Sequence, residues 1–302
     1  MEDIKITFLG TGSAVPSPTR NHTGILAQLL NESILVDCGE GTQIQFRKAE
    51  ISPHKITKLL ITHWHGDHIL GIPGLFQTLA LSDYSKTLEI YGPKGSKEFM
   101  NSINILLGHH KISYKLHEVN SGKIFEDENY FIEAKEMSHG LPSLAYSIVL
   151  KDKLRLDKNK LKKLKVPNSP IIRELLKGKN IKLGNKTIKS KQVTYKEKGK
   201  KLTIILDTLF NKNAISIAKN SDLLITESSF LESSEKGAKL AKDYKHLTAH
   251  QSAQIAKKSK SKKLILTHIS ERYSNDPLIL KEEAKKVFKN TEIASDLQVI
   301  TL

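Results

Sequence analysis

The chain has 302 residues, 38% of them hydrophobic, which suffices for a folded globular protein of one large domain or two small ones. It contains no run of about eighteen apolar residues, which argues against a membrane partner, and residues 1–5 lack the basic and apolar regions of a signal peptide. Its single cysteine, Cys38, cannot form an internal disulfide, so we expect a soluble cytoplasmic protein.

The net charge of +16 is concentrated in one segment of the chain. Residues 151–201 contain 19 Lys and Arg against 4 Asp and Glu, a net charge of +15, which leaves +1 for all the other residues. Such asymmetry favours a polyanionic partner for this segment. A solvated lysine-rich loop is the alternative interpretation.

Short β-branched runs alternate with helical patterns in the first half of the chain. Strands are predicted over 5–9, 33–37, 56–62 and 88–91, and helices over 41–50, 67–81 and 96–107. From 111 to 150 strand follows strand, with breaks at 121–122 and 126–129. This half is predicted to form a sheet with helices packed outside it.

The basic segment 151–201 interrupts this pattern. It contains two prolines and three glycines, its apolar residues are scattered, and the helical piece at 171–176 is too short to hold a core alone. We therefore predict an arm that projects from the body.

The alternating pattern returns after residue 201. Strands are predicted over 202–206, 223–226, 264–267 and 299–301, and helices over 214–219, 249–258 and 278–288. The whole chain, 1–302, is thus predicted to be one α/β domain, a sandwich of two β-sheets with helices outside, interrupted by the 151–201 arm.

A dense group of metal-ligand residue types follows the apolar run before residue 63. An extended loop would direct His63 and His65 the same way, and a turn at Gly66 would let Asp67 and His68 approach from another side. Imidazole and carboxylate groups bind zinc and leave a coordination position open for water. The spacing therefore predicts a catalytic metal site.

Three further candidate ligands lie at predicted strand ends. His139, Asp207 and His268 each follow an apolar run, where a strand passes into a loop on one rim of the sheet. Taken alone, each would more often be a surface or capping residue than a ligand. Together with the 63–68 group, they favour metal binding.

Several longer strings resemble the ribonuclease Z family, the tRNA 3′-processing endonucleases of the metallo-β-lactamase superfamily. The resemblance covers nearly the whole chain except the detailed sequence of the arm. The strings are FLGTGSAVP at 8–16, RN at 20–21, DCGEGTQ at 37–43, HILGIPGL at 68–75, HG at 139–140 and THISERY at 267–273.

The resemblance implies the metallo-β-lactamase αββα sandwich and two zinc ions per subunit. One ion would be held by His63, His65 and His139, the other by Asp67, His68 and His268, with Asp207 bridging. It also implies a zinc-dependent endoribonuclease that removes the 3′ trailer from precursor tRNA and leaves a 3′-hydroxyl, through attack of a metal-activated hydroxide on the phosphodiester. The enzyme would be a homodimer in which each arm clamps the tRNA bound at the partner's active site.

The same resemblance suggests roles for residues around the metals. Asp67 would orient the attacking water, and His246 would protonate the leaving 3′-oxygen as the general acid. Glu227, at the end of a strand, would orient His246. Arg20 and Asn21 would belong to a substrate loop, where a guanidinium can bind a phosphate through two hydrogen bonds.

Two departures and two rival functions accompany this interpretation. The arm carries 168–170 Asn-Ser-Pro in place of the usual Gly-Pro, and Ile44 stands where the family commonly has a basic residue. A thioester, lactam or small phosphodiester hydrolase could use the same metal loop, but the basic arm argues against it. A nucleic-acid-binding protein with structural zinc would need four closed ligands, often cysteines, and the chain has one cysteine.

Overall fold

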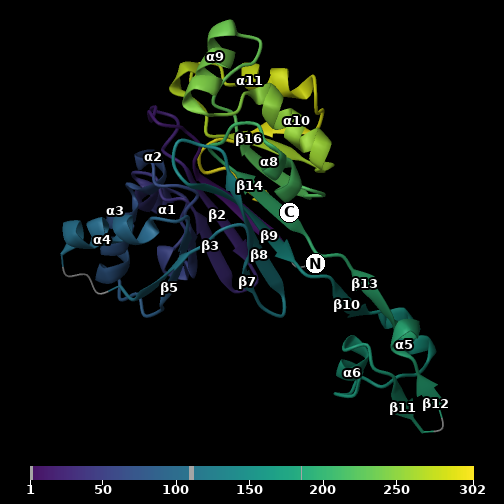
Figure 1. Ribbon diagram of the computed structural model, residues 1–302. Helices are drawn as coiled ribbons and strands as arrows, with labels where there is room; N and C mark the ends of the chain where they lie inside the picture. The colour runs from purple at the N-terminus through teal and green to yellow at the C-terminus, as the bar shows by residue number, and fades with distance from the viewer. Residues whose placement is uncertain (1–2, 109–111, 185) are drawn as a thin grey trace.

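The computed structural model describes residues 3–108, 112–184 and 186–302. Two seven-stranded sheets pack face to face (Figure 1). In spatial order the first sheet contains β18 (Val299–Thr301), β1 (Ile4–Gly10), β2 (Gly24–Leu29), β3 (Glu32–Val36), β4 (Lys58–Leu60), β5 (Leu88–Gly92) and β6 (Tyr114–Glu118). The second contains β17 (Thr291–Ile293), β16 (Leu264–Thr267), β15 (Leu223–Glu227), β14 (Lys201–Ile205), β9 (Ser143–Leu150), β8 (Tyr130–Met137) and β7 (Gly122–Glu126).

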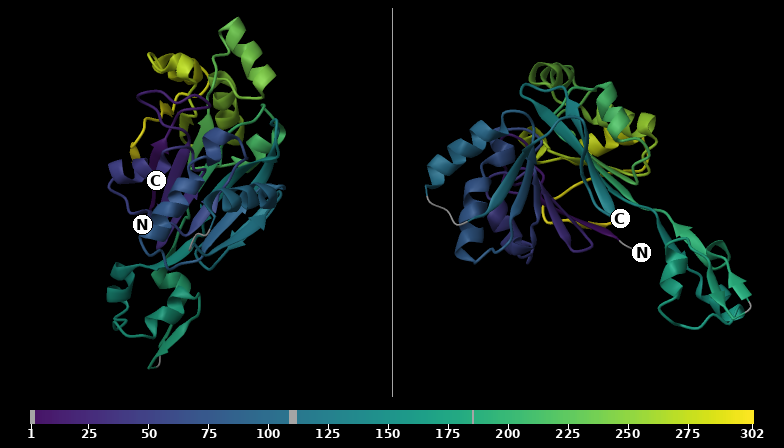
Figure 2. Two further views of the ribbon diagram at one scale, coloured as in Figure 1. Left: turned by 90° about the vertical axis from the view of Figure 1, so that its left-hand side faces the viewer. Right: turned by 60° about the horizontal axis from the view of Figure 1, so that its bottom comes forward.

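Helices cover the outer face of each sheet (Figures 1 and 2). On the first sheet lie α1 (Thr42–Lys48), η1 (Pro53–Lys55), α2 (Gly66–Ile69), α3 (Ile72–Leu81) and α4 (Ser96–Leu107). On the second lie α8 (Lys212–Ile217), α10 (Ala249–Ser259), η2 (Glu271–Tyr273) and α11 (Leu278–Lys285), while α9 (Glu235–Tyr244) lies beyond them at the top of the view in Figure 1. One apolar core fills the space between the sheets, and one lies under each helical layer, which confirms the αββα sandwich.

The expected helix over 67–81 is divided into α2 and α3. The Gly71 amide donates to the Cys38 carbonyl at 2.9 Å, and a Cβ on Gly71 would lie 2.0 Å from the Gly39 oxygen. This close approach of two backbones ends α2 and packs the metal loop onto the turn after β3.

Helix α9 was not predicted from the sequence. Its segment, EKGAKLAKDY, is mostly polar and buries only Gly237 and Ala241, so it lacks a broad apolar face. Lys111, where the expected run of strands begins, lies outside the described residues. Within the described ranges, no helix is long and apolar enough to cross a membrane.

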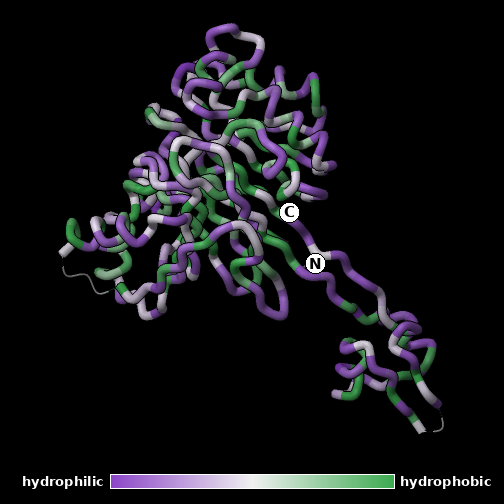
Figure 3. Tube along the Cα trace, in the orientation of Figure 1, coloured by the Kyte–Doolittle hydropathy of each residue, from purple (hydrophilic) through white to green (hydrophobic). Residues whose placement is uncertain are grey.

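The basic segment projects from the body as an arm (Figure 1). Its elements are β10 (Lys153–Leu156), α5 (Lys158–Lys163), α6 (Ile172–Leu176), β11 (Ile181–Leu183), β12 (Lys186–Ile188), α7 (Ser190–Val193) and β13 (Thr194–Glu197). Strands β10 and β13 pair as an antiparallel stalk. Long stretches of the arm itself are hydrophilic (Figure 3). The end of the arm nevertheless has a small apolar core, which was not predicted from the sequence. This core is formed by Leu161, Ile172, Leu175, Ile181, Ile188 and Val193.

The strand directions bring the candidate ligands to one rim. Strands β14, β15 and β16 are parallel, and so are β3 and β4, so each group ends at a common edge. The arm leaves from the opposite edge, since it connects the end of β9 with the start of β14. About six residues, or roughly 20 Å of extended strand, separate Lys201 at the arm's root from Asp207 at the rim.

Candidate metal centre

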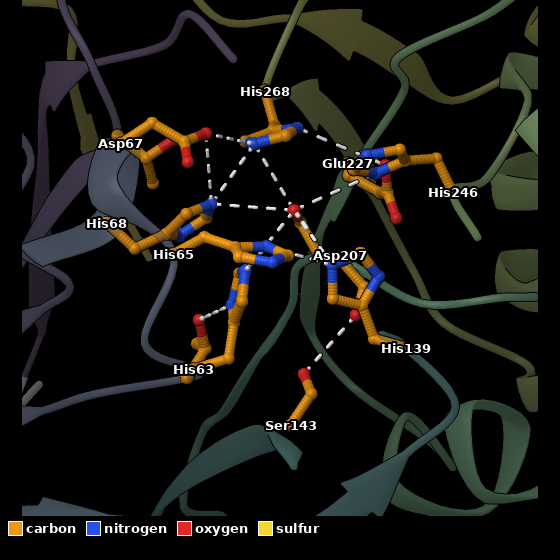
Figure 4. Close-up of polar contacts among 12 residues, drawn as sticks. His63, His65, Asp67, His68, His139, Ser143, Asp207, Glu227, His246 and His268 are labelled. Carbon is orange, nitrogen blue, oxygen red and sulfur yellow. Dashed lines mark hydrogen bonds and ion pairs between the residues drawn. The ribbon is translucent and has the colours of Figure 1, made fainter. Parts of the chain in front are cut away.

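The metal loop presents its ligands from an extended stretch followed by a helical turn. His63 and His65 follow β4 in extended backbone, and α2 begins at Gly66, so Asp67 and His68 lie in its first turn. His63 and His68 are completely buried. The seven predicted ligand side chains point toward one another at the rim (Figure 4).

Asp207, which follows β14, lies among the imidazoles. Its Oδ2 is 3.5 Å from Nε2 of His63, 3.6 Å from Nε2 of His68 and 3.8 Å from Nε2 of His139. Its Oδ1 is 3.2 Å from Nε2 of His268. Oδ1 is buried and accepts no hydrogen bond from the part of the chain that the structure describes. A carboxylate among so many ring nitrogens is suited to bridging two cations.

Two ligand sets face Asp207 from opposite sides. In the first, Nδ1 of His65 is 3.0 Å from Nε2 of His63 and 3.2 Å from Nε2 of His139. The second set consists of Asp67, His68 and His268; in it, the two imidazole Nε2 atoms lie 3.2 Å apart, and each is 3.3 Å from Oδ2 of Asp67. Atoms within each of these sets, with Asp207 added to the first, lie within 4.8 Å of one another.

Hydrogen bonds fix the tautomers of His63 and His139. The Thr62 hydroxyl donates to Asp37 at 2.7 Å, so at 3.1 Å it accepts from Nδ1 of His63. Nδ1 of His139 lies 2.9 Å from the Lys245 carbonyl, which can only accept. In both neutral rings Nε2 therefore carries a lone pair and no proton.

The two histidines of the second set are fixed in the same way. Nδ1 of His68 donates to the Asp37 carboxylate at 2.6 Å. Nδ1 of His268 donates at 3.0 Å to the Ser229 hydroxyl, whose own proton goes to Glu227 at 2.8 Å. When both rings are neutral, the Nε2 lone pairs of His68 and His268 face each other at 3.2 Å. Facing lone pairs repel unless a cation lies between them, so these residues fit a bound metal.

The carboxylates around His68 also favour a positive charge at the centre of the cluster. Burial lowers the pKa of His68, but the carboxylates of Asp207, Asp37 and Asp67 outweigh it and raise that pKa well above its ordinary value. Burial raises the pKa of Asp207, yet the surrounding histidines hold that pKa well below its usual range. The Asp207 carboxylate therefore remains ionised and attracts a cation, and a proton on His68 can take the place of that cation.

His246 and Glu227 form a pair at the edge of the cluster (Figure 4). Nδ1 of His246 donates to Oε2 of Glu227 at 2.8 Å, and the Thr208 amide donates to Oε1 at 2.7 Å, which fixes the fully buried carboxylate. Burial lowers the pKa of His246, but Glu227 and Asp207 outweigh it and raise this pKa to about 9. The ring lies 3.8 Å from Asp207 and keeps a proton near neutral pH.

Arg20 and Asn21 occupy a different setting from a phosphate-binding pair. The Arg20 side chain is buried, and its Nη1 donates at 2.7 Å both to the Thr11 hydroxyl and to the Ala294 carbonyl. Nδ2 of Asn21 donates to the Glu40 carbonyl at 2.7 Å. In this structure both side chains hold loops together, and the expectation that the Arg20 guanidinium binds phosphate stays a prediction.

Asp37 is a functional residue that was not singled out from the sequence. It follows β3 at the same rim as the other carboxyl-end residues, so the strand-end rule that selected Asp207 would have found it. Thr62, Ser229 and the Lys245 carbonyl carry no such signal, because a hydroxyl or a main-chain oxygen acquires its role only from tertiary contacts.

Comparisons with known proteins agree with this geometry. A family model described as anti-Pycsar protein Apyc1 matches residues 4–160. Ribonuclease Z of Listeria welshimeri is 41% identical over 305 residues, covering 98% of both chains, and that of Bacillus velezensis is 38% identical over 99% of both. The solved short form of human tRNase Z is similar over 98% of both chains, with 28% identity and a TM-score of 0.71. The metallo-β-lactamase fold protein YhfI of Bacillus subtilis, at 20% identity and a TM-score of 0.72, shows the fold alone.

Replacing Asp37 by asparagine tests whether its hydrogen bond to Nδ1 of His68 keeps that ring ready to bind a metal. Asp37→Asn is expected to weaken zinc binding by roughly 10- to 100-fold, because His68 loses the acceptor that orients its ring. Competition with a chromogenic chelator measures this affinity. Glu32→Gln is the matched control, since Glu32 begins the same strand at the far end, where it binds Lys58. Unchanged zinc affinity in folded Asp37→Asn protein would exclude a role of Asp37 in orienting His68 for zinc binding.

Proposed function

This chain belongs to the ribonuclease Z family, and from that premise we propose that it is a zinc-dependent endoribonuclease that removes the 3′ trailer from precursor tRNA. The tRNA would retain a 3′-hydroxyl. The observation that carries the proposal is the convergence of imidazole nitrogens on Asp207 at one rim of the sandwich. We also place the enzyme in the cytoplasm, in agreement with its lone, buried cysteine.

The proposed ligand assignment follows the two sets at the rim. His63, His65 and His139 would hold one zinc ion and Asp67, His68 and His268 the other, with Asp207 as the ligand that both share. When bound, the two ions lower the pKa of a shared water and stabilise the attacking and leaving oxygens of a phosphodiester. Histidine and carboxylate donors without cysteine suit zinc in an open, catalytic site.

Two side chains supply the remaining chemistry. The Asp67 carboxylate, whose Oδ2 lies 3.3 Å from Nε2 of both His68 and His268, would also accept a hydrogen bond from the attacking water and so orient it. His246 delivers the proton that the departing 3′-oxygen of the tRNA requires. Glu227 keeps that imidazole oriented and charged through the bond to Nδ1, which leaves Nε2 as the donor.

The arm supplies affinity for RNA away from the scissile bond. Its charge of +15 and its separate fold suit contacts to phosphates, which give strength that falls with salt and carry little base information. The small core at its end stiffens it, so it can present lysines at a fixed distance from the body.

The position of the arm supports a homodimer. An arm that leaves the sheet at the start of β14 lies roughly 20 Å from the Asp207 end of the same strand. An arm so placed serves a second copy's site more readily than its own. In the proposed dimer, each arm therefore holds the tRNA bound at the partner's metal centre.

Replacing the arm by a short turn separates binding from chemistry. Leu154 and Lys196 are paired across the stalk, so residues 155–195 can be exchanged for Asn-Gly, which closes a two-residue hairpin. Cleavage of precursor tRNA is expected to fall roughly 100-fold or more, because the phosphate contacts are lost. Hydrolysis of a chromogenic phosphodiester should remain near that of the full chain. Equal loss of both activities would contradict the binding role.

Substituting His246 tests the general acid. His246→Ala is expected to slow tRNA cleavage by roughly 10²- to 10⁴-fold with two zinc ions still bound. Hydrolysis of a nitrophenyl phosphodiester should fall much less, since nitrophenolate leaves without a proton. His250→Ala is the matched control, because His250 lies one helical turn on and binds Gln254. An equal loss on both substrates would rule out proton donation by His246.

A further inference from the structure

The carboxylate of Asp296, close to the end of the chain, joins three distant segments. It lies between β17 and β18 and accepts a hydrogen bond from the Thr11 hydroxyl at 2.6 Å. Its other oxygen accepts from the Asn21 amide at 2.7 Å and from Nε2 of Gln45 at 2.9 Å. One side chain thus connects three segments: the one between β17 and β18 to which it belongs, the loop between β1 and β2 with both Thr11 and Asn21, and helix α1.

Arg20 completes this junction. Its guanidinium donates to the same Thr11 hydroxyl that donates to Asp296, and also to the Ala294 carbonyl. Thr11 is completely buried and relays between the two charged groups. The contacts of Arg20 with Thr11 and Ala294 therefore help to hold these segments together.

One path from the junction leads to His268. The Ile269 amide donates to the Thr11 carbonyl at 2.8 Å, and the Ser13 amide donates to the Ile269 carbonyl at 3.1 Å. These bonds hold the residue next to His268, whose own backbone is left-handed with φ 54°. His268 needs such support, because a non-glycine residue adopts that conformation only when its surroundings impose it.

A second path leads to Asp67 and His68. Asn21 donates to the Glu40 carbonyl at 2.7 Å and so anchors the turn after β3. In this turn a Cβ on Gly39 would lie 2.4 Å from the Asp67 carbonyl, and the Cys38 amide donates to the His68 carbonyl at 2.7 Å. The turn is thus packed directly against the backbone of both ligands.

We infer that Asp296 is a positioning residue that sets the geometry of one half of the metal centre, the set of Asp67, His68 and His268. This inference rests on the ligand assignment proposed above. The other set has different supports, namely Thr62 beside His63 and the Lys245 carbonyl beside His139. Loss of Asp296 therefore weakens one zinc ion selectively.

Asp296→Asn places an amide nitrogen or oxygen where the carboxylate accepts three hydrogen bonds. Stepwise zinc titration of the metal-free variant, followed with a competing chelator, is expected to show one ion bound as in the unsubstituted protein. The second ion is expected to bind about tenfold or more weakly. Thr11→Val, which keeps the side-chain shape and removes the relay, should weaken binding of the same ion, and it replaces Asp296→Asn as the test if that variant does not fold.

Asp222→Asn is the matched control, since Asp222 also accepts a backbone amide, that of Lys201, but precedes β15 at the far edge. It should leave both zinc affinities unchanged. If the unsubstituted protein binds fewer than two ions, the ligand assignment itself fails. If it binds two and Asp296→Asn either binds both normally or weakens both equally, only the role of Asp296 is overturned.

Discussion

The metal centre depends on the proton positions of four buried imidazoles. Thr62, Asp37, Ser229 and a main-chain carbonyl each accept the Nδ1 proton of one ring, so every Nε2 lone pair is directed inward. Lone pairs that face one another at about 3 Å are stable only around positive charge. Asp37, which orients the His68 ring, also favours that charge together with Asp207 and Asp67, so orientation and affinity share a cause at this ring.

The topology separates this chemistry from substrate capture. Strand β14 carries the arm's root at one end and the bridging Asp207 at the other, so a single short strand joins the two functions. The arm has its own apolar core, and the rim has its own hydrogen-bond network. Under the proposed function, changes in the arm would therefore alter substrate affinity without disturbing the ligands.

Much of the site could be predicted from the sequence, because strand ends are visible in it. His139, Asp207 and His268 each follow a strand, and the structure places all three beside the 63–68 loop. What could not be predicted depends on contacts between distant segments. Arg20 resembles a phosphate ligand in sequence, yet its guanidinium is buried against Thr11 and against residue 294, which is 274 positions away.

The fold, like the site, has parts that local sequence patterns predict and parts that depend on contacts between distant segments. The αββα layers follow from the alternation of strands and helices, and helix 96–107 was predicted with its observed bounds. The break between α2 and α3 results from the close contact of the Gly39 backbone with Gly71. No local sequence pattern encodes this contact between two separate segments. The core of the arm was missed because its apolar residues are scattered in the sequence and meet only after folding.

The central claim is that the rim cluster, loaded with two zinc ions, cleaves precursor tRNA at its 3′ side. Mapping the cut on one end-labelled precursor tRNA, with zinc counted in the same sample, tests it most directly. We expect a single cut that leaves a 3′-hydroxyl on the tRNA. Chelation should abolish this cleavage, and it should return as zinc is restored to two ions per subunit. Undiminished cleavage by metal-free protein, or intact precursor after incubation with fully loaded protein, would contradict it.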